Sequence, residues 1–126
     1  MKRNNLKRFF EETSFFVYIE YMGYVYLIED IDNKRYKIGV TKDLKKRLRN
    51  LQTGNSNQIQ LLESFKSEYP FRLETMLHNK FKQFHHYNEW YELDKNSVDE
   101  FLNLCKYFND IIIALKDNPF FAKNLH

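Results

Sequence analysis

The stretch that decides the fold runs from residue 23 to residue 41 and reads GYVYLIEDIDNKRYKIGVT. Residues 24–29 are rich in aromatic and β-branched side chains, and the turn formers Asp30, Asp32 and Asn33 follow them. Residues 35–40 have a second strand pattern, so the stretch predicts a β-hairpin. Both faces of the first strand carry apolar side chains, which predicts burial on both sides for most of that strand.

A basic helix is predicted after the hairpin, over about residues 43–53. Thr41 or Asp43 would cap this helix, and Gly54 would end it. Its apolar stripe consists of Leu44, Leu48 and Leu51. At about 100° per residue, Arg47 falls at the flank of the stripe, so we expect it near the sheet, at the boundary with solvent. Three other cations should be solvated: Lys45, Lys46 and Arg49.

A third strand is predicted over residues 59–65, and a second helix begins at Pro70, a favourable first-turn position. The apolar stripe of this helix consists of Leu73, Leu77, Phe81 and Phe84. Glu74 lies at the flank of the stripe, again at the boundary with solvent. His78 follows one turn later on the same side of the helix as Glu74.

The rest of the chain is predicted to be mainly helical. Residues 89–93 form a short extended segment, and Ser97 and Glu100 make a capping box that opens a long helix. The buried face of this helix should consist of Val98, Phe101, Leu102, Cys105, Phe108, Ile112 and Leu115. Asn118 and Pro119 stop the helix. Residues 1–22 form an N-terminal extension, with a short helix from about residue 6 to residue 13.

Composition places limits on the class of protein. A chain of 126 residues is long enough for one domain with a modest core, and twelve Phe and nine Tyr predict a largely aromatic one. Cys105 is the only cysteine, so a reducing compartment fits and an intrachain disulfide is excluded. The apolar runs at residues 15–19 and 111–115 are too short for a signal peptide or a membrane span. We therefore expect a cytoplasmic or intracellular protein that is neither secreted nor membrane-bound.

The formal net charge of +3 is too small to indicate a partner, but the charge is unevenly distributed. Between residues 34 and 49, eight Lys or Arg residues stand against one acid, Asp43. A phosphate backbone is the natural counterpart of such a patch. A solvated helix face explains an isolated basic run equally well.

Five motifs in order resemble the GIY-YIG nuclease superfamily, and most closely its phage and large-virus branch. They read GYVYLIED, YKIGVT, DLKKRLRNLQTGN, LETMLHNKF and EWYEL, and they cover residues 23–93. The resemblance implies an α+β fold, with a small three-stranded antiparallel sheet flanked by helices. Residues 23–93 would be the nuclease-like domain, and residues 94–126 an additional C-terminal helical extension packed on it.

The resemblance also implies a site. The first-motif tyrosine of the family matches Tyr26, the helix arginine matches Arg47, and the metal-binding glutamate matches Glu74. Lys37 stands where the family has its second-motif tyrosine, and Leu51 stands where it often has a histidine. His78 would replace that histidine as a proton carrier, although a histidine beside a helix stripe is more often structural.

The chemistry of these residue types suits phosphodiester hydrolysis. Glu74 would hold Mg²⁺ or Mn²⁺, Arg47 would clamp a phosphate, and Tyr26 would hold the attacking water or act as general base. Lys37 would support Tyr26 if the hairpin register puts both on one face, which the sequence leaves open. Each residue also has an ordinary role, as a first-turn acid, a surface arginine or a core aromatic.

The sequence therefore predicts a metal-dependent endonuclease that acts on DNA and needs no small-molecule cofactor. Four cations would contact the nucleic acid: Lys42, Lys45, Lys46 and Arg49. The missing second-motif tyrosine and the missing histidine leave a second hypothesis, a catalytically silent nucleic-acid-binding module on the same scaffold. A third is a protein-interaction domain that uses the aromatic N-terminal segment.

Overall fold

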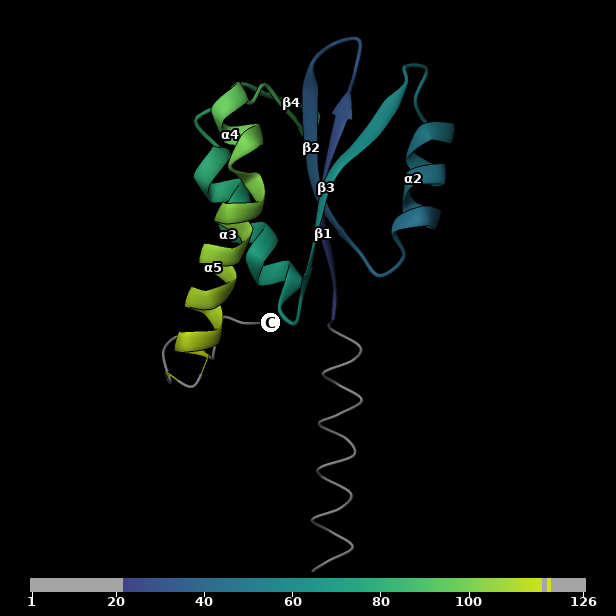
Figure 1. Cartoon of the computed structure of the whole chain (residues 1–126). Helices are drawn as coiled ribbons and strands as arrows, with labels where there is room; N and C mark the ends of the chain where they lie inside the picture. The colour runs from purple at the N-terminus through teal and green to yellow at the C-terminus, as the bar shows by residue number, and fades with distance from the viewer. Residues whose placement is uncertain (1–21, 117, 119–126) are drawn as a thin grey trace, which may run out of the picture.

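A computed structural model describes residues 22–116 and residue 118, and it shows an antiparallel sheet with helices on both faces (Figure 1). The predicted N-terminal helix and the predicted stop at Pro119 lie outside the described residues. The strands are β1 (Gly23–Asp30), β2 (Arg35–Thr41), β3 (Ile59–Ser67), β4 (His86–Tyr87) and β5 (Trp90–Tyr91). The helices are α2 (Leu44–Thr53), α3 (Pro70–Phe81), α4 (Lys95–Asp99) and α5 (Phe101–Leu115).

The sheet has five strands in the order β3-β1-β2-β5-β4. The predicted α+β class is confirmed, but the predicted number of three strands is wrong. The two additional strands form a hairpin in which Tyr87 pairs with Trp90, and β5 joins β2 where Tyr91 pairs with Tyr36. Strands of two residues are too short to show the alternation that a sequence pattern needs.

The pairing of β1 with β2 fixes which side chains share a face of the sheet. Tyr26 pairs with Gly39, and Ile28 pairs with Lys37. Because side chains alternate along a strand, Tyr26 and Lys37 lie on the same face. Val25 and its partner Val40 lie on the opposite face. The register that the sequence left open therefore puts Tyr26 and Lys37 on one face of the sheet.

The face that carries Val25, Leu27 and Ile38 packs against α3 and α5. The buried core consists of Val25, Leu27, Ile38, Leu73, Leu77, Phe81, Tyr91, Leu93, Phe101, Cys105 and Ile112. Most of these side chains are aliphatic, so the prediction of a largely aromatic core is wrong for the described residues. β1 is buried along most of its length, as its apolar pattern predicts.

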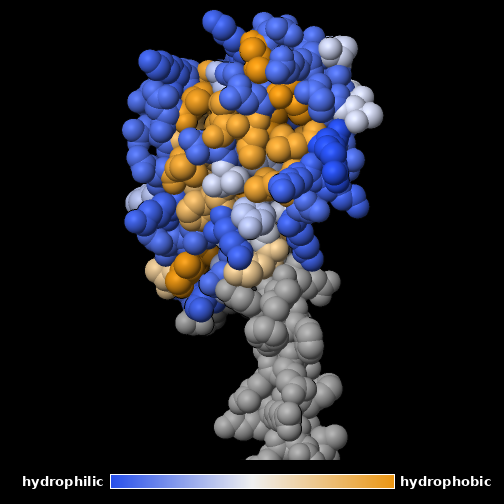
Figure 2. Space-filling view, turned by 45° about the vertical axis from the view of Figure 1, so that its right-hand side comes forward, coloured by the Kyte–Doolittle hydropathy of each residue, from blue (hydrophilic) through white to orange (hydrophobic). Residues whose placement is uncertain are grey.

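Helix α2 stands on the other face of the sheet, apart from α3, α4 and α5 (Figure 1). Asp43 caps α2 by accepting a hydrogen bond from the Lys46 N–H over 3.1 Å. Thr41 instead bonds the backbone of Asp43. Gly54 ends the helix, as predicted. Figure 2 shows hydrophobic residues in the middle of one face of the molecule and hydrophilic residues around them.

The predicted capping box at Ser97 and Glu100 is wrong. Asp94 caps α4 by accepting from the Ser97 N–H over 2.7 Å, so the helical segment begins earlier than predicted. The chain turns at Glu100, whose carboxylate accepts from Asn103 instead of from a backbone N–H. Leu102 and Leu115 are exposed, so their predicted burial on α5 is wrong.

Within the described part of the chain, no helix is long and apolar enough to cross a membrane.

Candidate active site

Tyr26 is at the centre of the site, and Gly39 makes room for it. The Tyr26 side chain is 2% exposed. A Cβ atom on residue 39 would overlap the phenol of Tyr26, at Oη and at Cζ. The phenol therefore lies across β2 at a point where the facing residue has no side chain. This close approach explains why glycine stands at position 39.

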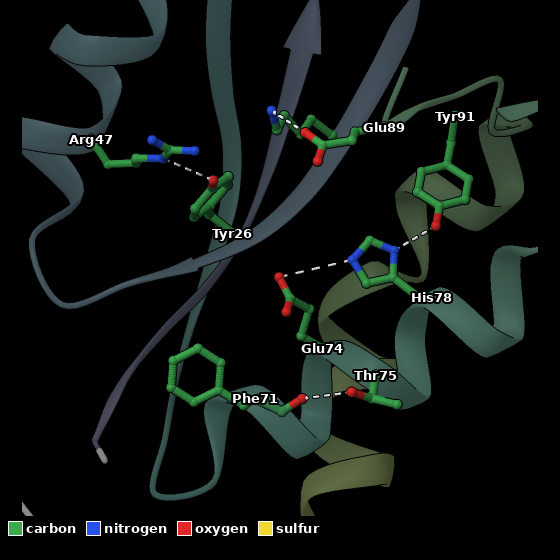
Figure 3. Close-up of polar contacts among 9 residues, drawn as sticks. Tyr26, Arg47, Phe71, Glu74, Thr75, His78, Glu89 and Tyr91 are labelled. Atoms are coloured by element: carbon green, nitrogen blue, oxygen red, sulfur yellow. Dashed lines mark hydrogen bonds and ion pairs between the residues drawn. The ribbon is translucent and has the colours of Figure 1, made fainter. Parts of the chain in front are cut away.

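Arg47 reaches Tyr26 from α2. The Nε–H group of Arg47 donates to Tyr26 Oη over 3.3 Å (Figure 3). Arg47 is half-buried, which confirms its predicted place at the boundary with solvent. The other three cations of α2 are exposed, as predicted: Lys45, Lys46 and Arg49. The guanidinium keeps further N–H groups on a planar fork that suits phosphate oxygens.

Glu74 and His78 approach from α3, which covers the opposite face of the sheet. His78 Nε2 lies 3.8 Å from Glu74 Oε2, and His78 Nδ1 shares a hydrogen bond with the Tyr91 hydroxyl (Figure 3). Burial raises the pKa of the Tyr91 phenol, and the Glu74 charge adds to this effect. Tyr91 therefore keeps its proton and can donate it to Nδ1 of a neutral His78 ring, whose other nitrogen, Nε2, faces Glu74.

Lys37 extends from the Tyr26 face of the sheet toward the β4–β5 hairpin. Its Nζ atom lies 3.1 Å from Glu89 Oε2 and 5.8 Å from the centre of the Trp90 ring. The hydrogen bond and the charge of Lys37 hold the pKa of the Glu89 carboxyl below its ordinary value, and Arg47 contributes through its charge. Lys37 is therefore paired with Glu89, a residue 52 positions later in the chain.

One cavity of about 460 Å³ joins all of these groups. Its lining consists of Tyr26, Lys37, Ile38, Gly39, Val40, Arg47, Glu74, His78, His86, Glu89 and Tyr91. The five residues predicted to be catalytic thus border the same space. The four cations predicted to contact nucleic acid lie on the surface outside this lining: Lys42, Lys45, Lys46 and Arg49.

Three polar lining residues were missing from the predicted site: His86, Glu89 and Tyr91. The EWYEL motif of the resemblance, residues 89–93, contains Glu89 and Tyr91 and was the sequence signal that could have pointed to them. His86 is exposed, as expected, yet it borders the cavity. Only the pairing of β5 with β2 brings this hairpin to the site, and that pairing joins residues far apart in the sequence.

The donor atoms at the site limit which metal ion could bind. Within residues 22–116 and residue 118, no group of three or more His, Cys, Asp or Glu side chains could hold a metal ion. A zinc site takes three or four protein ligands, so this donor set does not suit zinc. Mg²⁺ keeps several waters and takes one or two carboxylates, so the half-buried carboxylate of Glu74 suits it.

Comparison with known families gives one match. A family described as the T5orf172 domain matches residues 23–106, from the start of β1 into α5. No curated protein and no solved structure matches the chain. The T5orf172 domain is associated with phages and occurs among nuclease-like families. The match supports a nuclease-like domain, while the narrower resemblance to GIY-YIG nucleases stays a prediction. Because the match covers more than half of its length, the chain belongs to the T5orf172 domain family.

Proposed function

We propose that this chain is a metal-dependent endonuclease of the GIY-YIG type that hydrolyses phosphodiester bonds in DNA. The observation that carries the proposal is the convergence of Tyr26, Arg47 and Glu74 on one cavity. Tyr26 comes from β1, a strand of the sheet. Arg47 and Glu74 come from α2 and α3, which lie on opposite sides of the sheet. A phenol, a guanidinium and a carboxylate on three separate elements meet the needs of phosphoryl transfer, which are positioning and charge stabilisation.

Tyr26 and Arg47 would act on the nucleophile and the phosphate. The attacking water would bond to Tyr26 Oη and lose its proton to this oxygen in its ionised form. As the new bond to phosphorus forms, the bond to the leaving oxygen breaks, and this oxygen takes a proton from solvent. The N–H groups of Arg47 that do not bond Tyr26 would bind the phosphate oxygens, whose charge increases in the transition state.

Glu74 would hold Mg²⁺ or Mn²⁺, and such an ion, when bound, supplies charge stabilisation at the phosphate and its leaving oxygen. His78 would orient the Glu74 carboxylate, because its Nε2 faces this group while the Tyr91 hydroxyl bonds Nδ1 on the other side of the ring. Neighbours that bond a ligand in this way are worth about 10- to 100-fold in metal affinity or activity. The exposed cations Lys42, Lys45, Lys46 and Arg49 would contact the DNA backbone beside the cavity.

Plasmid cleavage tests the proposal. The full chain should nick or linearise supercoiled DNA with Mg²⁺ or Mn²⁺ and stop when EDTA is added. Glu74→Gln should reduce the rate by at least about 100-fold, since it removes the proposed carboxylate ligand. Glu92→Gln is the matched control, because Glu92 is exposed and does not line the cavity. A wild-type protein that does not cut, or a Glu74 variant that cuts like the control, would overturn the proposal.

The silent DNA-binding module remains the second candidate, and one observation favours it. Lys37 and Leu51 stand where the resemblance expects a tyrosine and often a histidine. The wild-type protein and the Glu74→Gln and Glu92→Gln variants also distinguish the endonuclease from the silent module. Salt-sensitive DNA binding that is independent of metal and of Glu74, without cleavage, would support the silent module.

A further inference from the structure

The tip of the β4–β5 hairpin has an unfavourable backbone at a residue that borders the cavity. Tyr87 pairs with Trp90, so Asn88 and Glu89 form a two-residue turn. Their φ angles are 48° and 71°, as in the turn type that fits such hairpins. Asparagine tolerates this left-handed region, but at the second position glycine is preferred, and glutamate is strained there.

The strain at Glu89 is not offset by a large gain in stability. The Glu89 side chain is 75% exposed, and exposed ion pairs contribute little to folding. Its Lys37 partner is only 15% exposed and lies over Trp90. A strained residue that makes a weak structural contact, yet borders the same cavity as Tyr26, Arg47 and Glu74, indicates a functional constraint.

We propose that Glu89 is a positioning residue that holds the Lys37 ammonium at the cavity beside Tyr26. This inference rests on the proposed function, since Lys37, on the same face of the sheet as Tyr26, would support Tyr26 in the reaction. A lysine has a flexible four-carbon stem, and restraining it before the substrate binds saves conformational entropy in the reaction. The two-residue turn brings the Glu89 carboxylate to Lys37, because β5 pairs with β2 at Tyr36, the residue before Lys37.

Substitutions at the turn separate this role from a merely structural one. Glu89→Gly removes both the strain and the carboxylate, so Tm should stay the same or rise by a few degrees while kcat falls by about 10- to 100-fold. Glu89→Gln should lower kcat to a similar extent, with KM for DNA nearly unchanged. Asn88→Gly is the matched control: it eases the same turn without touching the cavity lining, so it should keep the wild-type kcat.

A double variant tests whether Glu89 acts through Lys37. If it does, Lys37→Met with Glu89→Gln should be no slower than Lys37→Met alone. Additive losses in the double variant would overturn the inference. Wild-type or increased kcat in both Glu89 variants would overturn it too, while leaving the proposed endonuclease intact.

Trp90 gives a readout that does not depend on cleavage. It is the only tryptophan in the chain, and Lys37 lies over its ring, so its fluorescence reports where the ammonium is. Glu89→Gln should change the Trp90 emission to that of Lys37→Met. If the wild-type protein does not cut DNA, this change would still support the positioning of Lys37 by Glu89. An emission spectrum that Glu89→Gln leaves unchanged would contradict it.

Discussion

At the scale of single residues, Gly39 and Tyr26 depend on each other. The phenol occupies the space that a Cβ on residue 39 would need, and Arg47 bonds the phenol at Oη. A larger side chain at residue 39 would therefore displace the Tyr26 phenol and, with it, the guanidinium of Arg47. Glycine is needed at position 39 because a side chain there would overlap Tyr26. Its backbone conformation does not require glycine, since no glycine in the described residues has a positive φ.

Gly39→Ala should therefore impair both stability and cleavage. The added methyl group meets the Tyr26 phenol inside a buried sheet, so the free energy of unfolding should fall by about 1–3 kcal/mol. Displacing Tyr26 by about 1 Å should slow cleavage by about 100-fold. Urea denaturation and the plasmid assay, both run where each variant is folded, check these values.

Gly54→Ala is the control for this substitution. A Cβ at residue 54 would have Asn50 O at 3.6 Å and Leu51 O at 3.9 Å, which is ordinary contact. Its stability and cleavage should stay close to wild type. A Gly39→Ala protein that behaves like Gly54→Ala would show that the Tyr26 ring does not need its present place.

Helical phase explains why some site residues could be predicted from the sequence. Arg47 and Glu74 sit at the flanks of leucine stripes, and their half-buried positions follow from that spacing. Tyr26 and Lys37 sit in strands, where the shared face depends on a register that only the folded hairpin sets. The sequence does not predict Glu89 and Tyr91 at the site, because a two-residue strand and its turn carry no pattern.

At the scale of elements, the turn between β1 and β2 is held by a buried carboxylate. Asp30 accepts hydrogen bonds from the backbone and side chain of Asn33 and from the side chain of Asn57. Asn57 precedes β3, so one carboxylate joins the turn to the loop beside it. Burial alone would raise the pKa of Asp30, but these bonds, with one from the backbone of Asp32, outweigh it and hold the pKa below its ordinary value of 3.8.

This lowered pKa gives a prediction for acid stability. The folded state binds the Asp30 proton more weakly than the unfolded state, so the stabilisation is present above the ordinary pKa and is lost as pH falls through the folded value. Asp30→Ala should therefore cost about 1–3 kcal/mol of unfolding free energy at pH 7. The difference from wild type should shrink below about pH 4.

Urea denaturation at pH 7 and at pH 3 measures this difference. Asp32→Ala is the control, because the Asp32 side chain is exposed in the same turn, and it should change stability by less than about 0.5 kcal/mol. An Asp30→Ala loss of equal size at both pH values would show that the charge of Asp30 does not contribute.

At the scale of the whole molecule, helices from the end of the chain complete the core that the first strands begin. Phe101, Cys105 and Ile112 of α5 belong to the same buried cluster as Val25 and Leu27 of β1. The position of α5 followed from apolar spacing, but the separate helix α4 before it did not, because the local contact of Asp94 with Ser97 starts that helix. We expect the sheet and α5 to unfold together.

Cys105 can test this expectation. Its thiol is fully buried, and burial raises its pKa to about 12, with the charge of Glu63 adding to the effect. The native thiol should therefore react with a disulfide reagent at pH 8 only when the protein opens. Labelling should accelerate in urea in parallel with global unfolding, and since Cys105 is the only cysteine, the signal has one source. Labelling far faster than global unfolding would mean that α5 opens separately.

The cavity that joins the two faces of the sheet has a consequence for fragments of the chain. Its lining divides into one group between residues 26 and 47 and another between residues 74 and 91. The loop that carries Ser56, between α2 and β3, separates the two groups in the sequence. In the fold, β1 connects the two parts of the chain, because it pairs with β2 on one side and with β3 on the other. A piece cut at this loop carries at most six of the eleven lining residues. Under the proposed function, neither half could harm the DNA of the cell that makes it, and activity would return only when the two halves complement each other.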